Sequence, residues 1–156
     1  MGYTNYYRTP KTMDKAKFKI LSEELEVAVG FMPGNHSSAS GDSKESAVIC
    51  GGDGTGEPEF TENVISFNGD AKTGNDHETF YLPREKPEGK SDKELCFDFT
   101  KTARKPYDIM VQVSMLRLKH HFPECEISSD GDSSDWKNGK ALYKEIFKEV
   151  APKLNE

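Results

Sequence analysis

The sequence has no apolar stretch near the roughly 20 residues that a membrane-spanning helix needs. Its first residues, MGYTNYYRTP, lack the apolar run of a secretory signal peptide. Cysteine is scarce: Cys50, Cys96 and Cys125 are odd in number, far apart and without C-x-x-C spacing, which fits neither a disulfide framework nor a zinc site. We therefore expect a cytoplasmic protein that contacts no membrane and carries no metal or cofactor.

The chain also lacks an excess of basic residues. Its 156 residues include 27 acidic and 21 basic side chains, which give a formal net charge of −6. General nucleic-acid binders usually carry a basic surface, so the composition argues against that class. Only 34% of the residues are hydrophobic, but 9 Phe, 6 Tyr and 1 Trp indicate a packed core. The length fits one domain over residues 1–156.

Periodicity and turn residues predict a mixture of strands and helices. Strand composition is found at 3–8, 47–50, 63–68, 77–82, 95–99 and 125–128, and helical periodicity at 12–30, 106–121 and from about 132 onward. The connections between the middle strands are too short and polar for crossover helices, so antiparallel pairing is expected. These patterns predict an α+β fold, with a mainly antiparallel sheet of about five strands and three helices packed on it.

Two details of this prediction can be checked against a structure. The segment 34–46, GNHSSASGDSKES, is small and polar, and is expected to be a flexible insertion. The last helix is expected to begin in the capping residues of 132–135 and to turn a set of apolar side chains inward. That set is Trp136, Tyr143, Ile146, Phe147, Val150 and Leu154.

Several short motifs resemble known signatures but miss a required residue. The segment 51–58, GGDGTGEP, lacks the Gly-Lys-Ser/Thr of a phosphate-binding loop. His77-Glu78 lacks the second histidine of a zinc-protease helix, and residues 130–135 lack the glycine and glutamate positions of a calcium loop. His120 and His121 point about 100° apart on a helix, so that helix alone cannot bring both to one metal. No metal site is predicted.

The most informative polar segment is basic and lies between a strand and a helix. Lys101, Arg104 and Lys105 precede the predicted start of the helix, and Asp108 is the one acidic residue between positions 101 and 121. Basic side chains together with the free N–H groups of a helix N-terminus can bind a phosphate or a carboxylate. The alternative is that Asp108 occupies the helix end while the basic side chains are solvated or pair with acidic loops.

Other polar and aromatic residues are candidates for the same cleft. Asn68 and His77 flank one connection between strands and could read hydroxyl groups or a base, and His77 with Glu78 could act as acid and base. Structural roles are the alternative, since Asn-Gly is a turn signal. The aromatic residues Tyr3, Tyr6, Tyr7 and Trp136 could stack on a base or belong to the core.

Four blocks of the sequence carry a resemblance that covers most of the chain. They are FNGD, HETF, KTARKPYD and SSDGDSSDW, and the segment 34–46 lies outside them. With these blocks the chain resembles a family of small, largely uncharacterised proteins of tailed phages and bacteria. Thr100 stands where similar proteins are expected to have cysteine, which weakens the idea of a cysteine nucleophile there. The resemblance implies an accessory protein, in the host cytoplasm if the chain is phage-encoded, and brings no established reaction.

This setting and the basic segment together lead to a functional hypothesis. Small accessory phage proteins include anti-defence proteins that bind or degrade nucleotide immune signals, so the resemblance implies a nucleotide-type ligand. Binding without turnover is expected, with Lys101, Arg104 and Lys105 on phosphate and Asn68 or His77 on the ribose or base. One alternative is a phosphodiesterase-like enzyme that uses His77 and Glu78 as catalytic residues. Another is a protein-binding inhibitor of a host factor, and a homo-oligomer is also compatible with the sequence.

Overall fold

The computed structural model describes residues 2–33, 47–86 and 95–155. The expected α+β class is confirmed, and the segment 34–46, predicted to be a flexible insertion, lies outside the described residues. The described residues form β1 (Thr4–Thr9), α1 (Lys15–Val29), β2 (Glu59–Phe60), β3 (Val64–Phe67), the 3-10 turn η1 (Ala71–Thr73), β4 (Phe80–Pro83), β5 (Cys96–Lys101), α2 (Asp108–His121), β6 (Glu126–Ser129), the 3-10 turn η2 (Ser133–Trp136) and α3 (Lys137–Phe147).

The described strands form two antiparallel sheets of three strands, where the sequence predicted one sheet of about five. The first sheet has the order β5-β1-β6 and the second has the order β2-β3-β4. The sheets meet where the Glu78 N–H donates to the Lys101 carbonyl, two residues before β4 begins. The predicted strand 47–50 contributes one isolated bridge, from Cys50 to Asn68, because a glycine-rich turn follows it.

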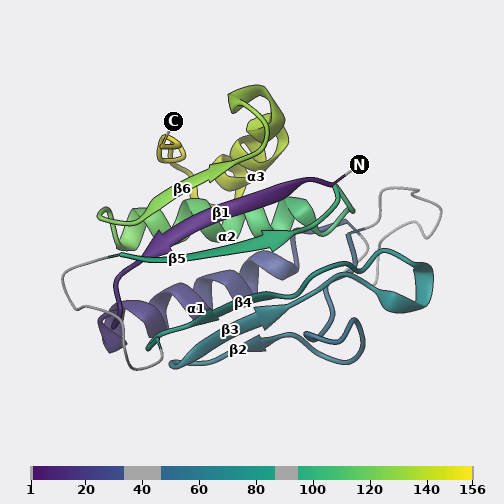
Figure 1. The fold of residues 1–156 in the computed structure, drawn as a ribbon, viewed down its shortest axis with the longest axis horizontal. Coiled ribbons are helices and arrows are strands. Elements are labelled where there is room, and N and C mark those ends of the chain that lie inside the picture. The colour runs from purple at the N-terminus through teal and green to yellow at the C-terminus, as the bar shows by residue number, and fades with distance from the viewer. Residues whose placement is uncertain (1, 34–46, 87–94, 156) are drawn as a thin grey trace.

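Helix α2 is the central helix of the fold. Figure 1 shows the first sheet crossing in front of α2, with α1 and α3 on either side of the helix. The sequence predicted one apolar face for this segment, yet every residue from Met110 to Leu118 is buried. The polar members of this run keep hydrogen-bond partners: Ser114 donates to the Met110 carbonyl, and Gln112 to the Asp135 carbonyl. Burial on all sides is therefore compatible with a helix that is not purely apolar.

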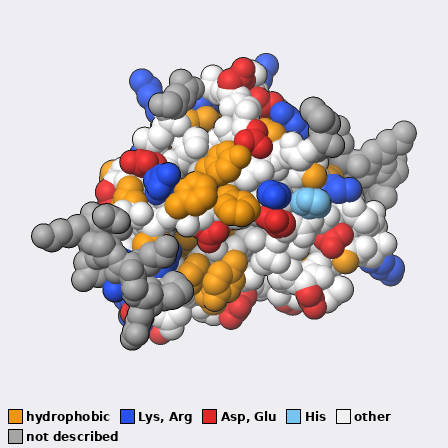
Figure 2. All heavy atoms as spheres, viewed as in Figure 1, with side chains coloured by type: hydrophobic (Ala, Val, Ile, Leu, Met, Phe, Trp, Pro, Cys, Tyr) orange, Lys and Arg blue, Asp and Glu red, His pale blue; other side chains and the backbone are white. Residues whose placement is uncertain are grey.

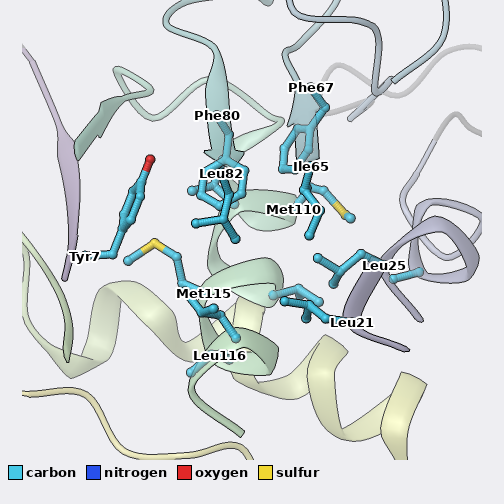
Figure 3. Packing of buried hydrophobic residues seen from close by; sticks show 14 of the residues in the cluster. Tyr7, Leu21, Leu25, Ile65, Phe67, Phe80, Leu82, Met110, Met115 and Leu116 are labelled. Atoms are coloured by element: carbon cyan, nitrogen blue, oxygen red, sulfur yellow. The ribbon is translucent and has the colours of Figure 1, made fainter. Parts of the chain in front are cut away.

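The main core lies between the sheets and the first two helices. In Figure 3, Tyr7 and the strand residues Phe67 and Phe80 point toward side chains from α1 and α2. The rings of Phe67 and Phe80 lie 5.1 Å apart between centroids, and those of Tyr7 and Phe80 lie 5.4 Å apart. The contact between Tyr7 and Phe80 joins strands of the two sheets, so the core holds both sheets in one unit.

The helix ends account for three differences from the sequence-based expectations. Helix α1 begins after Asp14, whose side chain accepts the Lys17 N–H, and not at Thr12. Helix α3 ends at Phe147 because Lys148 has a left-handed φ of 61° and turns the chain away. Val150, expected to face inward, is consequently 80% exposed. Asp132 is a capping residue as expected, since its side chain accepts the Ser134 N–H in a capping box, but it caps the 3-10 turn η2, and α3 begins after that turn at Lys137.

The cysteines behave as small apolar residues. Cys50, Cys96 and Cys125 are buried and free of disulfides. Burial raises the pKa of the Cys125 thiol to about 12, which leaves it protonated and unreactive near neutral pH. Among the described residues, no helix is both long and apolar enough to cross a membrane.

Candidate functional site

A tight loop connects β5 to α2 and positions the basic residues. The N–H groups of Thr102 and Ala103 both donate to the Tyr3 carbonyl, and the Lys105 N–H donates to the Thr102 carbonyl. Between these bonds, Ala103 and Arg104 have left-handed φ values of 53° and 58°. Two successive non-glycine residues in this region are uncommon and energetically costly, and such costs gather at functional sites. The loop is therefore a candidate site.

Arg104 is held in one position at the surface. Its guanidinium carbon lies 4.1 Å from the centre of the Tyr3 ring, and its Nη1 donates to the Asp135 carboxylate at 2.8 Å. The Arg104 side chain is nevertheless 59% exposed. The hydrogen bond from Arg104 lowers the pKa of Asp135, so this carboxyl is ionised at neutral pH. Asp135 partly neutralises the guanidinium without covering it.

Arg104 and Lys105 line one pocket of about 330 Å³ at the start of α2. This volume is at the lower end of the roughly 300–1,000 Å³ of small-molecule sites. The Lys105 ammonium donates to the Gly74 carbonyl at 3.0 Å, which ties the pocket to the turn after η1. The polar residues of the lining are Arg104, Lys105, Asp108, Gln112, Asp135 and Asn138. Two cations thus face two carboxyl groups and two amides, which is a polar site of nearly balanced charge.

The backbone at the start of α2 offers less to an anion than the sequence suggested. The Asp108 N–H donates to the Lys105 carbonyl at 2.8 Å, and the Met110 N–H donates to the Tyr107 carbonyl at 2.9 Å. These bonds use N–H groups that the sequence-based prediction had left free for a phosphate. An anion in this pocket would therefore depend mainly on the side chains of Arg104 and Lys105.

Asp108 does not cap the helix but turns into a buried hydrogen-bond network. Its carboxylate accepts hydrogen bonds from Asn5 at 2.7 Å, Thr102 at 2.6 Å and Gln112 at 3.1 Å. Burial raises the pKa of Asp108, although these three donors oppose the effect. Within the described part of the chain, the side-chain oxygen of Asn5 is buried without a hydrogen-bond partner. This network holds Asp108 and Gln112, which line the pocket next to Arg104, in fixed positions.

Asn68 has a structural environment away from this pocket. Its buried side chain accepts the N–H groups of Gly69 and His77 and donates to the carbonyls of Gly52 and His77. These bonds hold two loops together, as expected for the turn alternative. His77 makes these bonds through its backbone, and the residue is exposed.

Glu78 and Lys101 form the junction between the two sheets. The Lys101 N–H donates to the Glu78 carboxylate at 2.9 Å, and the Tyr107 hydroxyl donates to the Glu78 carbonyl at 2.5 Å. The Lys101 ammonium lies 5.8 Å from the centre of the Phe99 ring. Lys101 therefore diverges from Arg104 and Lys105 onto the outer face of the first sheet, and it does not line their pocket.

The aromatic residues divide between core and surface. Tyr3, Tyr7 and Trp136 are buried, so they offer no stacking surface to a ligand. Tyr6 lies on the outer face of the first sheet, beside two exposed aromatic residues that the sequence reasoning did not single out. These are Phe97 and Phe99, which are 47% and 41% exposed. Their two-residue spacing in CFDFTK places them on one face of β5, and this spacing could have revealed them.

A second arginine organises a partly buried cluster of charged residues. Arg117 donates to Glu24, Glu149 and Tyr143, and its guanidinium carbon lies 4.1 Å from the centre of the Phe147 ring. The Nε2 of His121 lies 2.5 Å from the Glu24 carboxylate. We call these residues, together with His120, the Arg117 cluster. Across residues 2–33, 47–86 and 95–155, no group of three or more His, Cys, Asp and Glu side chains could hold a metal ion.

Comparisons with protein-family models, curated proteins and solved structures found no match. Among the described residues, the pocket of Arg104 and Lys105 and the aromatic outer face of the first sheet are two candidate binding surfaces.

Proposed function

We propose that the protein binds and sequesters a small phosphorylated ligand of nucleotide type in the pocket at the start of α2. The observation that carries the proposal is the convergence of Arg104 and Lys105 on one pocket of about 330 Å³. A guanidinium can bind a phosphate through two parallel charge-assisted hydrogen bonds, and an ammonium adds a point charge. The amide of Asn138 supplies a donor and an acceptor for a ribose or a base in the same pocket, whereas the Gln112 amide already donates to Asp108 and to the Asp135 carbonyl.

The two carboxyl groups of the pocket set its selectivity. Asp135 already accepts a hydrogen bond from Nη1 of Arg104, so a phosphate must use the remaining N–H groups or displace this carboxylate. The Asp108 carboxylate lies largely buried at the pocket and already accepts three hydrogen bonds. A simple anion gains little in such a balanced site, whereas a ligand that also fills the pocket and bonds the Asn138 amide gains more. This favours a nucleotide-type molecule over inorganic phosphate.

Binding without turnover fits the placement of the residues proposed for catalysis. The Glu78 carboxylate accepts the Lys101 N–H, and neither Glu78 nor His77 belongs to the pocket lining. A phosphodiesterase-like activity would need a free base beside the bound phosphate, and both carboxyl groups of the pocket are engaged, Asp108 in the buried network and Asp135 with Arg104. The resemblance to phage and bacterial proteins makes an immune signalling nucleotide the class of ligand to test first.

The test compares ligand binding and stability in matched variants. Isothermal titration with adenosine 5′-monophosphate and with cyclic dinucleotides should show binding to the wild type. Arg104→Ala should lower the affinity by roughly tenfold to hundredfold, the size of a lost charge-assisted hydrogen bond. Lys72→Ala, which removes an exposed cation outside the pocket, should leave the affinity unchanged.

Three results would contradict the proposal. Equal binding by wild type and Arg104→Ala would remove the pocket from consideration. Recovery of a cleaved nucleotide after incubation and denaturation would establish turnover and favour the enzyme alternative. A stable complex with a host protein, in the absence of any nucleotide binding, would favour the protein-binding inhibitor.

A further inference from the structure

The outer face of the first sheet carries an aromatic row where a solvent-facing sheet normally carries polar residues. The register pairs Tyr6 with Phe99, Arg8 with Phe97 and Thr4 with Lys101. Side chains alternate along each strand, so these six residues share one face. Figure 2 shows hydrophobic side chains gathered at the centre of this view, with cationic and acidic side chains around them.

The rings of this row lie close together and share similar orientations. The Tyr6 and Phe97 rings are 6.0 Å apart between centroids and inclined by 23°, and the Phe97 and Phe99 rings are 6.0 Å apart and inclined by 38°. The Tyr6 hydroxyl donates to the Asp130 carboxylate at 2.5 Å, which fixes the orientation of this ring. The row is therefore organised before any ligand arrives, which limits the entropy lost on binding.

Cationic side chains stand at both ends of the row. The guanidinium carbon of Arg8 lies 4.9 Å from the centre of the Phe97 ring, and the Lys101 ammonium lies 5.8 Å from that of Phe99. Arg8 also lies 3.7 Å from Glu126, in a pair that is about half exposed on each side. Arg8 is opposite Phe97 and Lys101 is four residues further along β5, so the backbone positions of these two residues are separated by roughly 14 Å of strand. This spacing suits two phosphates of one strand better than a single phosphate.

Polar groups border the aromatic row along β6. Ser128 and Glu126 lie opposite Tyr6 and Arg8 in the sheet. With Asn155 they line a shallow pocket of about 280 Å³ whose other walls include Tyr6, Arg8 and Phe97. A hydroxyl, an amide and a carboxylate next to flat rings match the edge and the face of a nucleobase. A narrow aromatic row bordered by polar groups is a poorer match for the broad apolar centre of a protein interface.

We propose that this face binds a short unpaired stretch of nucleic acid, with successive bases stacked on Phe97 and Phe99 and phosphates placed at Arg8 and Lys101. An aromatic ring accepts any base, and exposed rings on a sheet are a common means of holding single strands. The net charge of −6 opposes tight general binding to nucleic acid, so stacking must supply most of the affinity. This site is separate from the pocket of Arg104 and Lys105 and does not depend on the function proposed for it.

The two cationic residues predict how the affinity for nucleic acid should depend on salt concentration. Two phosphate contacts to a single strand should give a slope of about −1.4 for the logarithm of affinity against the logarithm of salt concentration. A basic nucleic-acid binder with many phosphate contacts gives a much steeper slope. The shallow slope is therefore a signature of binding that depends on stacking.

The experiment measures the fluorescence anisotropy of short labelled oligouridylate and oligothymidylate with the intact protein. Phe97→Ala and Phe99→Ala should each weaken binding by roughly tenfold to hundredfold, because each removes a stacked base. Phe97→Tyr should keep most of the affinity. Phe31→Ala removes a similarly exposed ring (43%) outside this sheet and should have no effect. Phe97→Leu, which keeps an apolar side chain at this position, should lose affinity with its melting temperature preserved.

Each remaining outcome overturns the proposal. Absence of binding by the wild type, or equal binding by Phe97→Ala, would exclude a stacking role for the face. Equal affinity for uridine 5′-monophosphate and for the oligonucleotide would reassign the face to free nucleotides. A dimer in sedimentation analysis that Phe97→Ala dissociates would assign the face to a second copy of the chain.

Discussion

Arg104 and Arg117 make the same kinds of contact in different surroundings. Each guanidinium carbon lies 4.1 Å from the centre of an aromatic ring, that of Tyr3 for Arg104 and that of Phe147 for Arg117. Each also pairs with carboxylate groups at hydrogen-bond distance. The Arg117 side chain is only 9% exposed, whereas that of Arg104 is 59% exposed.

This difference in burial separates a structural group from one that a ligand can reach. Arg117 uses Nε, Nη1 and Nη2 in hydrogen bonds to Glu24, Glu149 and Tyr143, and so joins α1, α2 and the end of the chain. Arg104 has one carboxylate partner in the described residues, Asp135, and presents the rest of its guanidinium to solvent. Similar pairwise contacts therefore do not imply similar roles.

The largest expected effect on stability comes from replacing Arg117, the buried arginine of the pair. Arg117→Met should lower the free energy of unfolding by about 3–5 kcal/mol, because it leaves Glu24 partly buried without its cation. Urea denaturation followed by circular dichroism measures this loss. Arg104→Met is the matched variant and should leave the denaturation midpoint almost unchanged. Equal losses in both variants would mean that burial does not distinguish the two sites.

The acid sensitivity of the Arg117 cluster is the next largest effect. Burial acts to raise the pKa of Glu24, but hydrogen bonds from Arg117 and His121 bring it below its ordinary value. A carboxyl group with a lowered pKa in the folded state stabilises the fold above its unfolded pKa, near 4.5, and loses this contribution as the pH falls through the folded value. The stability difference between wild type and Glu24→Gln should therefore shrink below pH 4.5.

This second prediction has an internal control. Melting temperatures of both proteins measured across the acid range give the difference directly, and effects of all other carboxyl groups cancel. A difference that stays constant as the pH falls would show that Glu24 does not contribute through its charge.

A smaller effect, on ligand affinity, is expected from changing the ion pair of Arg104, the exposed arginine. Asp135→Asn should strengthen the binding of adenosine 5′-monophosphate by roughly twofold to fivefold, since it releases Arg104 from an exposed ion pair. The amide oxygen can still accept the hydrogen bond from the Asp132 N–H. Glu59→Gln removes an acidic charge on β2 and serves as the control. Weaker binding by Asp135→Asn would indicate that Asp135 contacts the ligand itself.

The smallest expected effect is that of a chelator. The Arg117 cluster contains two imidazoles and two carboxylates, but the guanidinium among them repels a cation. We expect EDTA and added zinc to leave the melting temperature unchanged, as calorimetry can show. A fall with EDTA that zinc restores would show that the protein needs a metal after all.

Much of the fold could be predicted because it depends on local patterns. The capping residues at Asp132, the helical periodicities and the apolar settings of the cysteines all lie within a few residues of the elements they describe. The pairing of Arg104 with Asp135 could not be predicted, because it joins residues 31 positions apart. The exposure of Phe97 was also hidden, since an alternating strand pattern does not say which face meets solvent.

The position of β1 has a consequence for how the chain folds. Strand β1 is the first element of the described chain, yet it lies in the middle of its sheet. Its two partner strands are residues 96–101 and 126–129. During synthesis, β1 therefore has neither neighbour until most of the chain has been made. Pairing over such long sequence separations makes folding slow, and unpaired aromatic strands are prone to aggregate. The segment TNYYRT is therefore prone to aggregate until residues 96–101 and 126–129 have been made.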